Sequence, residues 1–538
     1  MTEVVMEQMP PVLHGPTEKQ RKYDRQLRLW AESGQAALES ANLLLVNSGC
    51  GTVGVETLKN LVLPGIGRFT IVDDAVVSEA DLGVNFFLDE GSLGKMRGQC
   101  STELLLELNP EVHGDWYPKT KGDLNLEKVL ATSSTFTLIM YTNPIRPADL
   151  AIIQAYGKQH KTPVVLVHSA GFYSYFRILL PGAFPIVDTH PDETATTDLR
   201  LLTPWPELVE FAKELTRDID SLDNHVHGHL PFVVILLHYL DEWRATHDGA
   251  YPLKYAEKIA FRNLVQSKMR TDNPEGGEEN FEEAVAAVLR AVQPTSLPSG
   301  IREVFDYKPT DPQEDGSPFW IIAEAVKKFY EKHRCLPVPG NVPDMKAESE
   351  VYIKLQNIYK AKARQDAAEV LKMVQAVPGG RDVDPAEVGL FCKNAAFVKL
   401  INASAGGGID TILNSERLAT VAAQEFSNDE MAEETLTPLS LLPIYLALYA
   451  TSHVESSTRE QIVSEIAKAV PGAGVNQRVV QAAEEVARAE GGELHNISAL
   501  TGGMVAQEVI KVITKQYIPI DNTCIFDGIG SRCQVLRL

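Results

Sequence analysis

Residues 43–97 hold the side chains whose spacing suggests chemistry most clearly, and that chemistry is nucleotide binding. An apolar run at 43–47 leads into a G-x-G-x-x-G motif and then into a helical pattern that reaches residue 61. The motif glycines are Gly49, Gly51 and Gly54. Glycine at these positions allows a tight turn and lets a phosphate approach the N-terminus of the helix. A second apolar run at 69–72 ends at Asp73, where an acid would bind a ribose hydroxyl.

This pattern predicts a nucleotide-type fold more firmly than it predicts an activity, because one fold can host many functions. A nicotinamide-dependent dehydrogenase is one enzyme class that the pattern leaves open, since Asp73 has the right position for it. No His/Asp or Tyr/Lys catalytic pair follows in a suitable context, which counts against that class.

Three histidines at alternate positions form a candidate metal site. They are His225, His227 and His229. On a strand they would share one face, so three imidazoles could meet one ion. Acidic residues and a glycine surround them, a composition typical of an exposed polar loop. We prefer the loop interpretation and expect no metal in this chain.

Residues 18–40 have the pattern of a helix with two neighbouring stripes. The apolar stripe consists of Tyr23, Leu27 and Trp30, and the basic stripe consists of Arg21, Arg25 and Arg28. A basic stripe of this kind is usually a solvated helix face paired with nearby acids. The fixed fork of a guanidinium also suits polyphosphate, so the stripe could serve a nucleotide that lies near it.

The composition is that of an ordinary globular protein with a strong acidic bias. The chain has 538 residues, 44% of them hydrophobic and 23% charged, and its formal net charge is −22. Such a length suggests two to four domains at roughly 150 residues each. The average field would repel DNA or RNA, so we expect no nucleic-acid partner and consider a basic protein surface more plausible.

Cysteine usage and apolar runs indicate where the protein works. The six cysteines, at 50, 100, 335, 392, 524 and 533, form no C-x-x-C pair, which argues against a zinc module and for a reducing compartment. Residues 1–11 lack a secretion signal, and the longest apolar run, 439–450, is too short to span a bilayer. We expect a cytoplasmic or nuclear protein, or one present in both places, with no membrane partner.

Strand and helix patterns alternate in the first third of the chain, which predicts a doubly wound, mostly parallel sheet. The predicted strands are 42–47, 68–73, 111–116, 136–141 and 162–168, and the helices between them are 53–62, 93–108 and 146–159. After about residue 180 the pattern becomes mainly helical. A helix at 495–513 and strands at 523–526 and 533–537 then suggest that the chain returns to its first domain.

These patterns predict an α/β protein whose Rossmann-like sheet domain carries a large, mainly helical insert. The expected boundaries are 12–177 for the first part of the sheet domain, 178–490 for the insert and 491–538 for the return segment.

Three segments resemble the ubiquitin-activating enzyme family. They are Lys22-Tyr-Asp-Arg-Gln-Leu-Arg-Leu-Trp30, Leu58-Lys-Asn-Leu-Val-Leu-Pro-Gly-Ile-Gly67 and Ala506-Gln-Glu-Val-Ile-Lys-Val-Ile-Thr514. The resemblance covers nearly the whole chain, including Tyr352-Ile-Lys-Leu-Gln-Asn-Ile-Tyr359. Within the family it is to the non-catalytic subunits of the heterodimeric enzymes of the neddylation pathway. It implies that the sheet domain is a degenerate adenylation domain and that the insert has the place of the catalytic-cysteine domain.

Active members of that family adenylate the C-terminal glycine of a ubiquitin-like protein, and this chain departs from their site. Asp73 matches the first acid of their D-x-D motif, but Ala75 replaces the second. Gly83, Val84 and Asn85 stand at the N-x-N-R-Q positions, Arg97 at the lysine and Asn143 at a late aspartate. Magnesium needs hard oxygen ligands and phosphoryl charge needs fixed cations, so the resemblance implies a site that does not adenylate. No cysteine precedes a threonine, so the thioester nucleophile is also missing.

The resemblance implies a regulatory subunit that supports a separate catalytic subunit, where ATP and magnesium bind. We expect no cofactor here, although the intact glycine motif leaves weak nucleotide binding open. By family precedent an N-terminal arginine reaches the partner's ATP, and by position this is Arg25, with Arg28 a poorer candidate. Further expected partners are the ubiquitin-like modifier and the cognate conjugating enzyme.

Two segments are candidate surfaces for the catalytic partner. One is the helix at 495–513 and the other is 344–357, within which we single out Asp344, Tyr352, Lys354, Gln356 and Asn357. Two other functions stay open at this point. The chain could be a stand-alone Rossmann-type enzyme, or a pure scaffold in which Arg25 has no kinetic effect.

Overall fold

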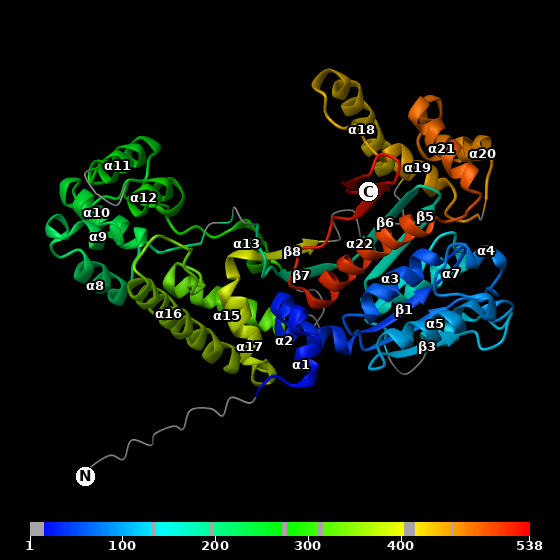
Figure 1. Cartoon of the computed structure of the whole chain (residues 1–538), viewed down its shortest axis with the longest axis horizontal. Coiled ribbons are helices and arrows are strands. Elements are labelled where there is room, and N and C mark those ends of the chain that lie inside the picture. The colour runs from blue at the N-terminus through cyan, green and yellow to red at the C-terminus, as the bar shows by residue number, and fades with distance from the viewer. Residues whose placement is uncertain are drawn as a thin grey trace, which may run out of the picture. The chain divides into compact units, whose positions relative to one another are not determined.

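The computed structural model of the chain describes residues 15–131, 135–192, 195, 197–271, 277–308, 316–402, 415–454 and 456–538. These residues form two compact units. The first unit lies within 1–184 and 401–538, and the second comprises 185–400. Figure 1 traces the chain through both units. Within the described ranges, no helix has the length and apolar character needed to cross a membrane.

An eight-stranded sheet forms the centre of the first unit, in the order β10-β9-β6-β5-β4-β1-β2-β3. The strands are β1 (Asn42–Val46), β2 (Arg68–Val72), β3 (His113–Tyr117), β4 (Leu138–Thr142), β5 (Val164–Ala170), β6 (Tyr173–Leu179), β9 (Thr523–Asp527) and β10 (Arg532–Leu536). Strands β3, β2, β1, β4 and β5 run parallel, whereas β6, β9 and β10 continue the sheet in antiparallel pairs. Every residue of β1, β4 and β5 is buried, as expected for central strands covered on both faces. The predicted α/β class and Rossmann-like sheet are confirmed.

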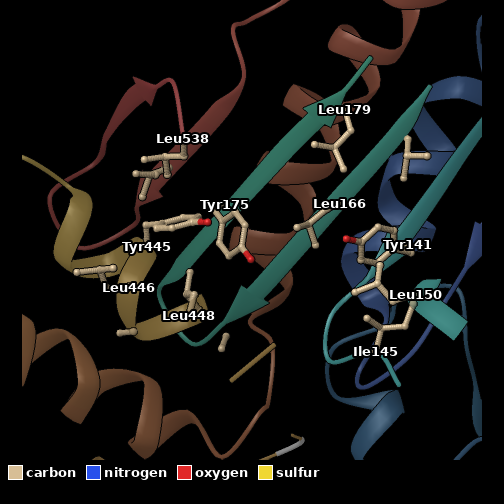
Figure 2. Packing of buried hydrophobic residues seen from close by; sticks show 14 of the residues in the cluster. Tyr141, Ile145, Leu150, Leu166, Tyr175, Leu179, Tyr445, Leu446, Leu448 and Leu538 are labelled. Carbon is tan, nitrogen blue, oxygen red and sulfur yellow. The ribbon is translucent and has the colours of Figure 1, made fainter. Parts of the chain in front are cut away.

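Helices cover both faces of this sheet. The helices of the first unit are α1 (Glu18–Lys22), α2 (Asp24–Ser40), α3 (Thr52–Val62), α4 (Glu79–Leu82), α5 (Arg97–Leu108), α6 (Leu126–Leu130), α7 (Pro147–His160), α18 (Ser415–Thr435), α19 (Leu442–Ala450), α20 (Arg459–Ala469), α21 (Gln477–Ala489) and α22 (His495–Thr514). On one face, α7 and α19 share a core with Leu44, Tyr141 and Tyr175 (Figure 2). Helix α3 packs on the other face, where the Leu45 side chain reaches its Gly54.

The pairing of α3 with α22 joins the beginning of the sheet domain to the return segment (Figure 1). Nine of the eleven residues of α3 are buried, so this helix has almost no free surface. Gly502 of α22 lies directly on α3, because a Cβ atom there would be 2.8 Å from the Thr57 amide nitrogen. The two backbones can approach this closely only because residue 502 has no side chain.

The second unit is mainly helical. Its helices are α8 (Pro206–Leu215), α9 (Asn224–His227), α10 (Phe232–Thr246), α11 (Tyr255–Ser267), α12 (Glu279–Ala291), α13 (Ser299–Asp306), α15 (Pro318–His333), α16 (Ser349–Gln375) and α17 (Pro385–Lys393). They form two apolar clusters, one around Phe261 and Tyr359 and the other around Trp320 and Phe391. Strands β7 (Ala183–Val187) and β8 (Val398–Asn402) pair where the chain passes between the units.

The division into units differs from the predicted insert of 178–490. Residues 178 and 179 belong to β6, and the described part of 415–490 belongs to the first unit. The physical reason is α19, whose residues 442–448 are all buried and pack against the sheet together with α20 and α21. The mainly helical insert therefore ends near residue 400, and the return segment begins there rather than at 491.

The predicted helix 18–40 is also interrupted. It begins as α1 and continues as α2 after Tyr23, and Trp30 and Ala31 have non-helical dihedral angles, with φ of 55° at Ala31. Both aromatic residues leave the helical pattern in order to be buried. The Asn109 amide donates to the Tyr23 hydroxyl (3.0 Å), and the Trp30 indole donates to Gln35 (3.1 Å).

Adjacent glycines of α22 provide a matched test of the α3–α22 contact. We expect Gly502→Ala to lower the free energy of unfolding by about 1–3 kcal/mol, because the new methyl group meets the α3 backbone. Gly503→Ala should be neutral or stabilise by up to about 1 kcal/mol, because no atom lies within 4 Å of its Cβ position and alanine favours a helix. Urea denaturation of the two variants measures both effects. Equal stability of the two would contradict the close packing.

Candidate functional site

The glycine motif adopts the turn that the sequence predicts between β1 and α3. Gly49 and Gly51 have φ of 62° and 67°, values that residues with side chains rarely adopt. A Cβ at Gly54 would lie 2.5 Å from the Asn47 side-chain oxygen and 3.1 Å from Leu45. The first two glycines therefore make the turn and the third permits close packing of the helix on the strand, which are the roles this motif has in nucleotide-binding folds.

A buried arginine reaches into this turn. Arg97, the first residue of α5, is 3% exposed, and all five of its N–H donors have acceptors. Two donate to the main-chain oxygens of Gly49 and Cys50, both at 2.9 Å. The others donate to Asp73 (2.8 and 3.2 Å) and to Asp81 (2.9 Å). The guanidinium thus binds the glycine loop on its carbonyl side.

Asp73 has no free oxygen for a ribose. Its Oδ2 accepts from Arg97 and from the Asn47 amide (2.8 Å), and its Oδ1 accepts from Arg97 and from the Ala75 amide (3.0 Å). The residue is 2% exposed. The side chain with the position of a ribose-binding acid is therefore held inside the protein as the counter-charge of Arg97.

The local charges shift the pKa values of two members of this cluster. Burial alone would raise the pKa of Asp81, but hydrogen bonds from Ser78 and the charge of Arg97 lower it below its usual value. Burial alone would lower the pKa of Arg97, but the charges and hydrogen bonds of Asp73 and Asp81 raise it. One cation and two carboxylates thus pair in a region with little access to water.

The N-terminus of α3, where a phosphate would bind, is also occupied. The buried carboxyl group of Glu493 accepts from the Val53 amide (2.8 Å) and from the Ser498 hydroxyl (2.5 Å). Burial raises the pKa of Glu493 to about 7, while these donors and Arg97 act in the opposite direction. Desolvation and the charge of Glu493 raise the pKa of the Cys50 thiol, inside the glycine turn, to about 11.

The carboxyl end of the sheet is closed beside this group. Residues 451–454 lie over this end of the sheet, after β4. The Ile145 amide donates to Ser452 O (2.9 Å), and Ile145 O lies 3.1 Å from His453 Nδ1. The cavity between this segment, His168 and Glu493 has a volume of about 10 Å³, enough for a single water molecule. Asn143, at the late-aspartate position, lines the same cavity. Among the described residues, this cavity is therefore far smaller than a nucleotide.

The histidine pattern does not form a metal site. His225 and His227 lie on the short helix α9 rather than on a strand, and His227 is buried with its Nδ1 2.6 Å from Glu278. His229 Nδ1 is 2.7 Å from the main-chain oxygen of His225. The part of the chain that the structure describes contains no group of three or more His, Cys, Asp or Glu side chains placed to hold an ion.

Five cysteines, Cys50 and the four named next, have a raised thiol pKa, whereas a nucleophilic cysteine needs a lowered one. Burial raises the pKa of Cys392 and of Cys524 to about 12, and it also raises those of Cys100 and Cys533.

The arginine stripe lies on the exposed side of α1 and α2, opposite buried Tyr23 and Trp30. Arg28 pairs with Asp24 at 3.0 Å. Arg25, in the first turn of α2, has no carboxylate within 4.0 Å among the described residues, so its guanidinium is available to a ligand outside the chain. The structure thus places Arg25 in the same unit as the glycine loop, on its surface.

The residues of the second candidate surface belong to the other unit. Asp344 Oδ1 accepts from the Met345 amide (3.1 Å), and the Tyr352 hydroxyl donates to Pro343 O (3.3 Å). On α16, Lys354 and Asn357 are exposed and Gln356 is half-buried.

Glu493 is the functional residue that the sequence interpretation missed. It follows Gly491 and Gly492 and precedes α22, and this local pattern indicates only a turn before a helix. Its hydrogen-bond partner Val53 is 440 residues away along the chain. Its local sequence contains no signal for that contact.

Comparison with known proteins agrees with this architecture. The model of the ThiF family matches residues 23–538. The chain is 36% identical to the NEDD8-activating enzyme E1 regulatory subunit of Xenopus laevis, over 95% of this chain and 97% of that protein. It is 32% identical to the regulatory subunit AXR1 of Arabidopsis thaliana, over 97% of both chains. The Saccharomyces cerevisiae regulatory subunit is 24% identical, over 96% of this chain and 100% of that protein.

The buried charge cluster generates a stability prediction. Arg97→Met should lower the free energy of unfolding by about 3–5 kcal/mol, because Asp73 and Asp81 lose their buried counter-charge. Adding Asp73→Asn should restore part of that loss by removing one of the unpaired charges. Urea denaturation at pH 7 measures these changes.

Arg146→Met is the matched control, since it breaks an exposed ion pair with Asp149 and should cost no more than about 1 kcal/mol. If Arg97→Met cost no more than this control, the cluster would not support the fold.

Proposed function

The chain belongs to the ThiF family, and we propose that it is the regulatory subunit of the heterodimeric enzyme that activates the ubiquitin-like modifier of the neddylation pathway. The observation that carries the non-catalytic part of this proposal is the occupied glycine loop. Arg97 binds its carbonyl side and Glu493 binds the helix N-terminus next to it. The fold of a nucleotide-binding domain is retained while the space for the nucleotide is filled.

In this proposal the reaction takes place in a catalytic partner chain. That chain binds ATP and magnesium, adenylates the modifier and carries the thioester cysteine. This chain holds no cofactor, because Asp73 cannot accept a ribose hydroxyl while Arg97 and Asn47 occupy it. The same contacts count against a nicotinamide-dependent dehydrogenase, which would need that acid.

The role of this subunit is to complete the partner's site and to support its adenylation domain. Arg25 is the residue proposed to reach the partner's ATP, since it is exposed and has no carboxylate partner in the described chain. A guanidinium there would stabilise the negative charge that develops as the adenylate forms. A pure scaffold is the competing possibility, and the effect of Arg25 on the reaction rate distinguishes the two.

Two exposed surfaces suit the contact with the catalytic partner. On α22, Leu500 is 50% exposed, and the neighbouring Met504 is partly exposed. On α16, Lys354 and Asn357 point to solvent. The modifier and the cognate conjugating enzyme are further proposed partners, in the cytoplasm, the nucleus or both.

The proposed role of Arg25 predicts a specific loss of activity. Arg25→Ala should leave the heterodimer assembled and slow ATP–pyrophosphate exchange by the partner at least about tenfold, which corresponds to roughly 1.4 kcal/mol. Removing one preorganised donor from an active site lowers the reaction rate by about 10²–10³-fold. Arg25→Lys should recover only part of the rate, because an ammonium lacks the planar fork.

Arg28→Ala is the matched control, because Arg28 is equally on the exposed face but pairs with Asp24.

The isolated chain, given ATP, magnesium and a ubiquitin-like modifier, should form neither an adenylate nor a reducible thioester. Normal exchange by an assembled Arg25→Ala complex would favour the scaffold, and a thioester on this chain alone would refute the non-catalytic role.

The exposed apolar face of α22 predicts a near-obligate heterodimer. Permanent interfaces bury on the order of 2,000 Å² or more and are apolar at their centres. Leu500→Glu should weaken assembly with the catalytic partner at least about tenfold, as measured by sedimentation. Leu253→Glu in the second unit is the control, since Leu253 is 49% exposed and lies outside both proposed surfaces. Unchanged assembly of Leu500→Glu would exclude this face from the interface.

A further inference from the structure

The first turn of α3 needs hydrogen-bond acceptors that its own sequence does not supply. The helix begins after Gly51, which has no side chain to cap it, and the first N–H groups of any helix lack partners within the helix. In nucleotide-binding folds a phosphate fills this place, attracted by the free N–H groups and the helix dipole. This chain keeps the turn and the helix that create such a site.

A carboxyl group from the return segment occupies the site. Glu493 Oε2 lies 2.8 Å from the Val53 nitrogen and 2.5 Å from the Ser498 hydroxyl, and the Gly51 amide also donates to the carboxyl group. Burial raises the pKa of this carboxyl group, and the charge of Arg97, on the opposite side of the glycine loop, acts in the other direction and favours the ionised form. Two main-chain amides, a hydroxyl and a nearby guanidinium are the kinds of group that bind a phosphate.

The position of Glu493 is fixed by the main chain on both sides of it. The Gly171 amide, in the turn between β5 and β6, donates to Gly492 O at 2.9 Å, and residues 171 and 493 pair as an isolated bridge. Ser498, which donates to the carboxyl group, lies in the first turn of α22. Glu493 is therefore held by the sheet, by α22 and by α3 together.

We propose that the N-terminus of α3 is an anion-binding site whose permanent ligand is the carboxyl group of Glu493, in the place that a nucleotide phosphate takes in related folds. The glycine loop is then complete without any bound nucleotide. The bond also ties α3 to the beginning of α22, one turn before Gly502 packs on Thr57.

Replacement of the carboxyl group by an added anion tests this proposal. Glu493→Ala removes the ligand and leaves the Val53 and Gly51 amides without an acceptor, so its thermal midpoint should fall by several degrees. Formate, acetate or inorganic phosphate should then raise the midpoint of Glu493→Ala in a saturable manner, relative to chloride at equal ionic strength. Wild type and Glu493→Gln, in which the site stays filled, should show no saturable response.

Glu508→Ala is the matched control. Glu508 is also buried on α22 and its carboxylate accepts from the Ile520 amide at 2.9 Å, but it lies at no helix N-terminus of the α3 kind. Loss of the Glu508 carboxylate should lower the thermal midpoint, and small anions should not raise that midpoint again in a saturable manner. An equal response of the two alanine variants would show general salt stabilisation and would overturn the proposal, as would saturable stabilisation of the wild type by phosphate.

Refolding yield keeps the proposal testable if Glu493→Ala does not fold in chloride. The denatured variant should recover soluble, folded chain when refolded in acetate or phosphate, and no gain in yield would count against the proposal. These readouts involve neither catalysis nor the partner. A failure here would remove Glu493 from the support for the non-catalytic role and leave the Arg97 contacts as its support. A failure of the subunit role would not change the anion response expected here.

Discussion

The first unit depends on the pairing of charges that its fold takes out of water. A buried carboxylate or guanidinium is stable only when hydrogen bonds and an opposite charge replace its hydration. Arg97 meets this requirement with five acceptors, two of which are the carbonyls of the glycine loop. Asp73 and Asp81 meet it through Arg97. The loop, the end of β2 and the start of α5 are therefore held together by one side chain, and they keep the geometry of a nucleotide site without a nucleotide.

The same pairing explains how the backbone of a glycine motif can be kept while protein side chains fill the space beside it. Asp73 and the glycine turn are the parts that a sequence motif records, and both are present. Arg97 and Glu493 form hydrogen bonds with these parts, and residues 451–454 lie nearby at the end of the sheet. A motif reports which conformation the backbone can adopt. It does not report which group fills the space beside that backbone, and that group decides whether the domain binds a nucleotide.

The bounds of the parallel strands were predicted from the sequence to within about two residues. Continuous apolar runs such as 43–46 and 138–141 are typical of strands whose two faces are both covered. Prediction from the sequence failed where long-range packing overrides a local pattern. The helix predicted at 18–40 is interrupted where Tyr23 and Trp30 are buried. Helix α19 packs on the sheet domain through an apolar surface, and the sequence of α19 alone does not distinguish this position from one in the insert. Glu493 could not be predicted as a partner of Val53, since the contact exists only after the return segment has found the first β-α-β unit.

A subunit that supports the chemistry of another chain has different physical requirements from an enzyme. An active site needs free donors, partly solvated charges and room for a ligand, and each of these lowers the stability of the domain. In this chain the corresponding groups form contacts within the fold: Asp73, which follows β2, pairs with Arg97, and the N-terminus of α3 binds Glu493. Arg25 is left exposed, at a position where a charge costs the fold little. The paired charges therefore lie inside the first unit, while the exposed arginine lies on its surface.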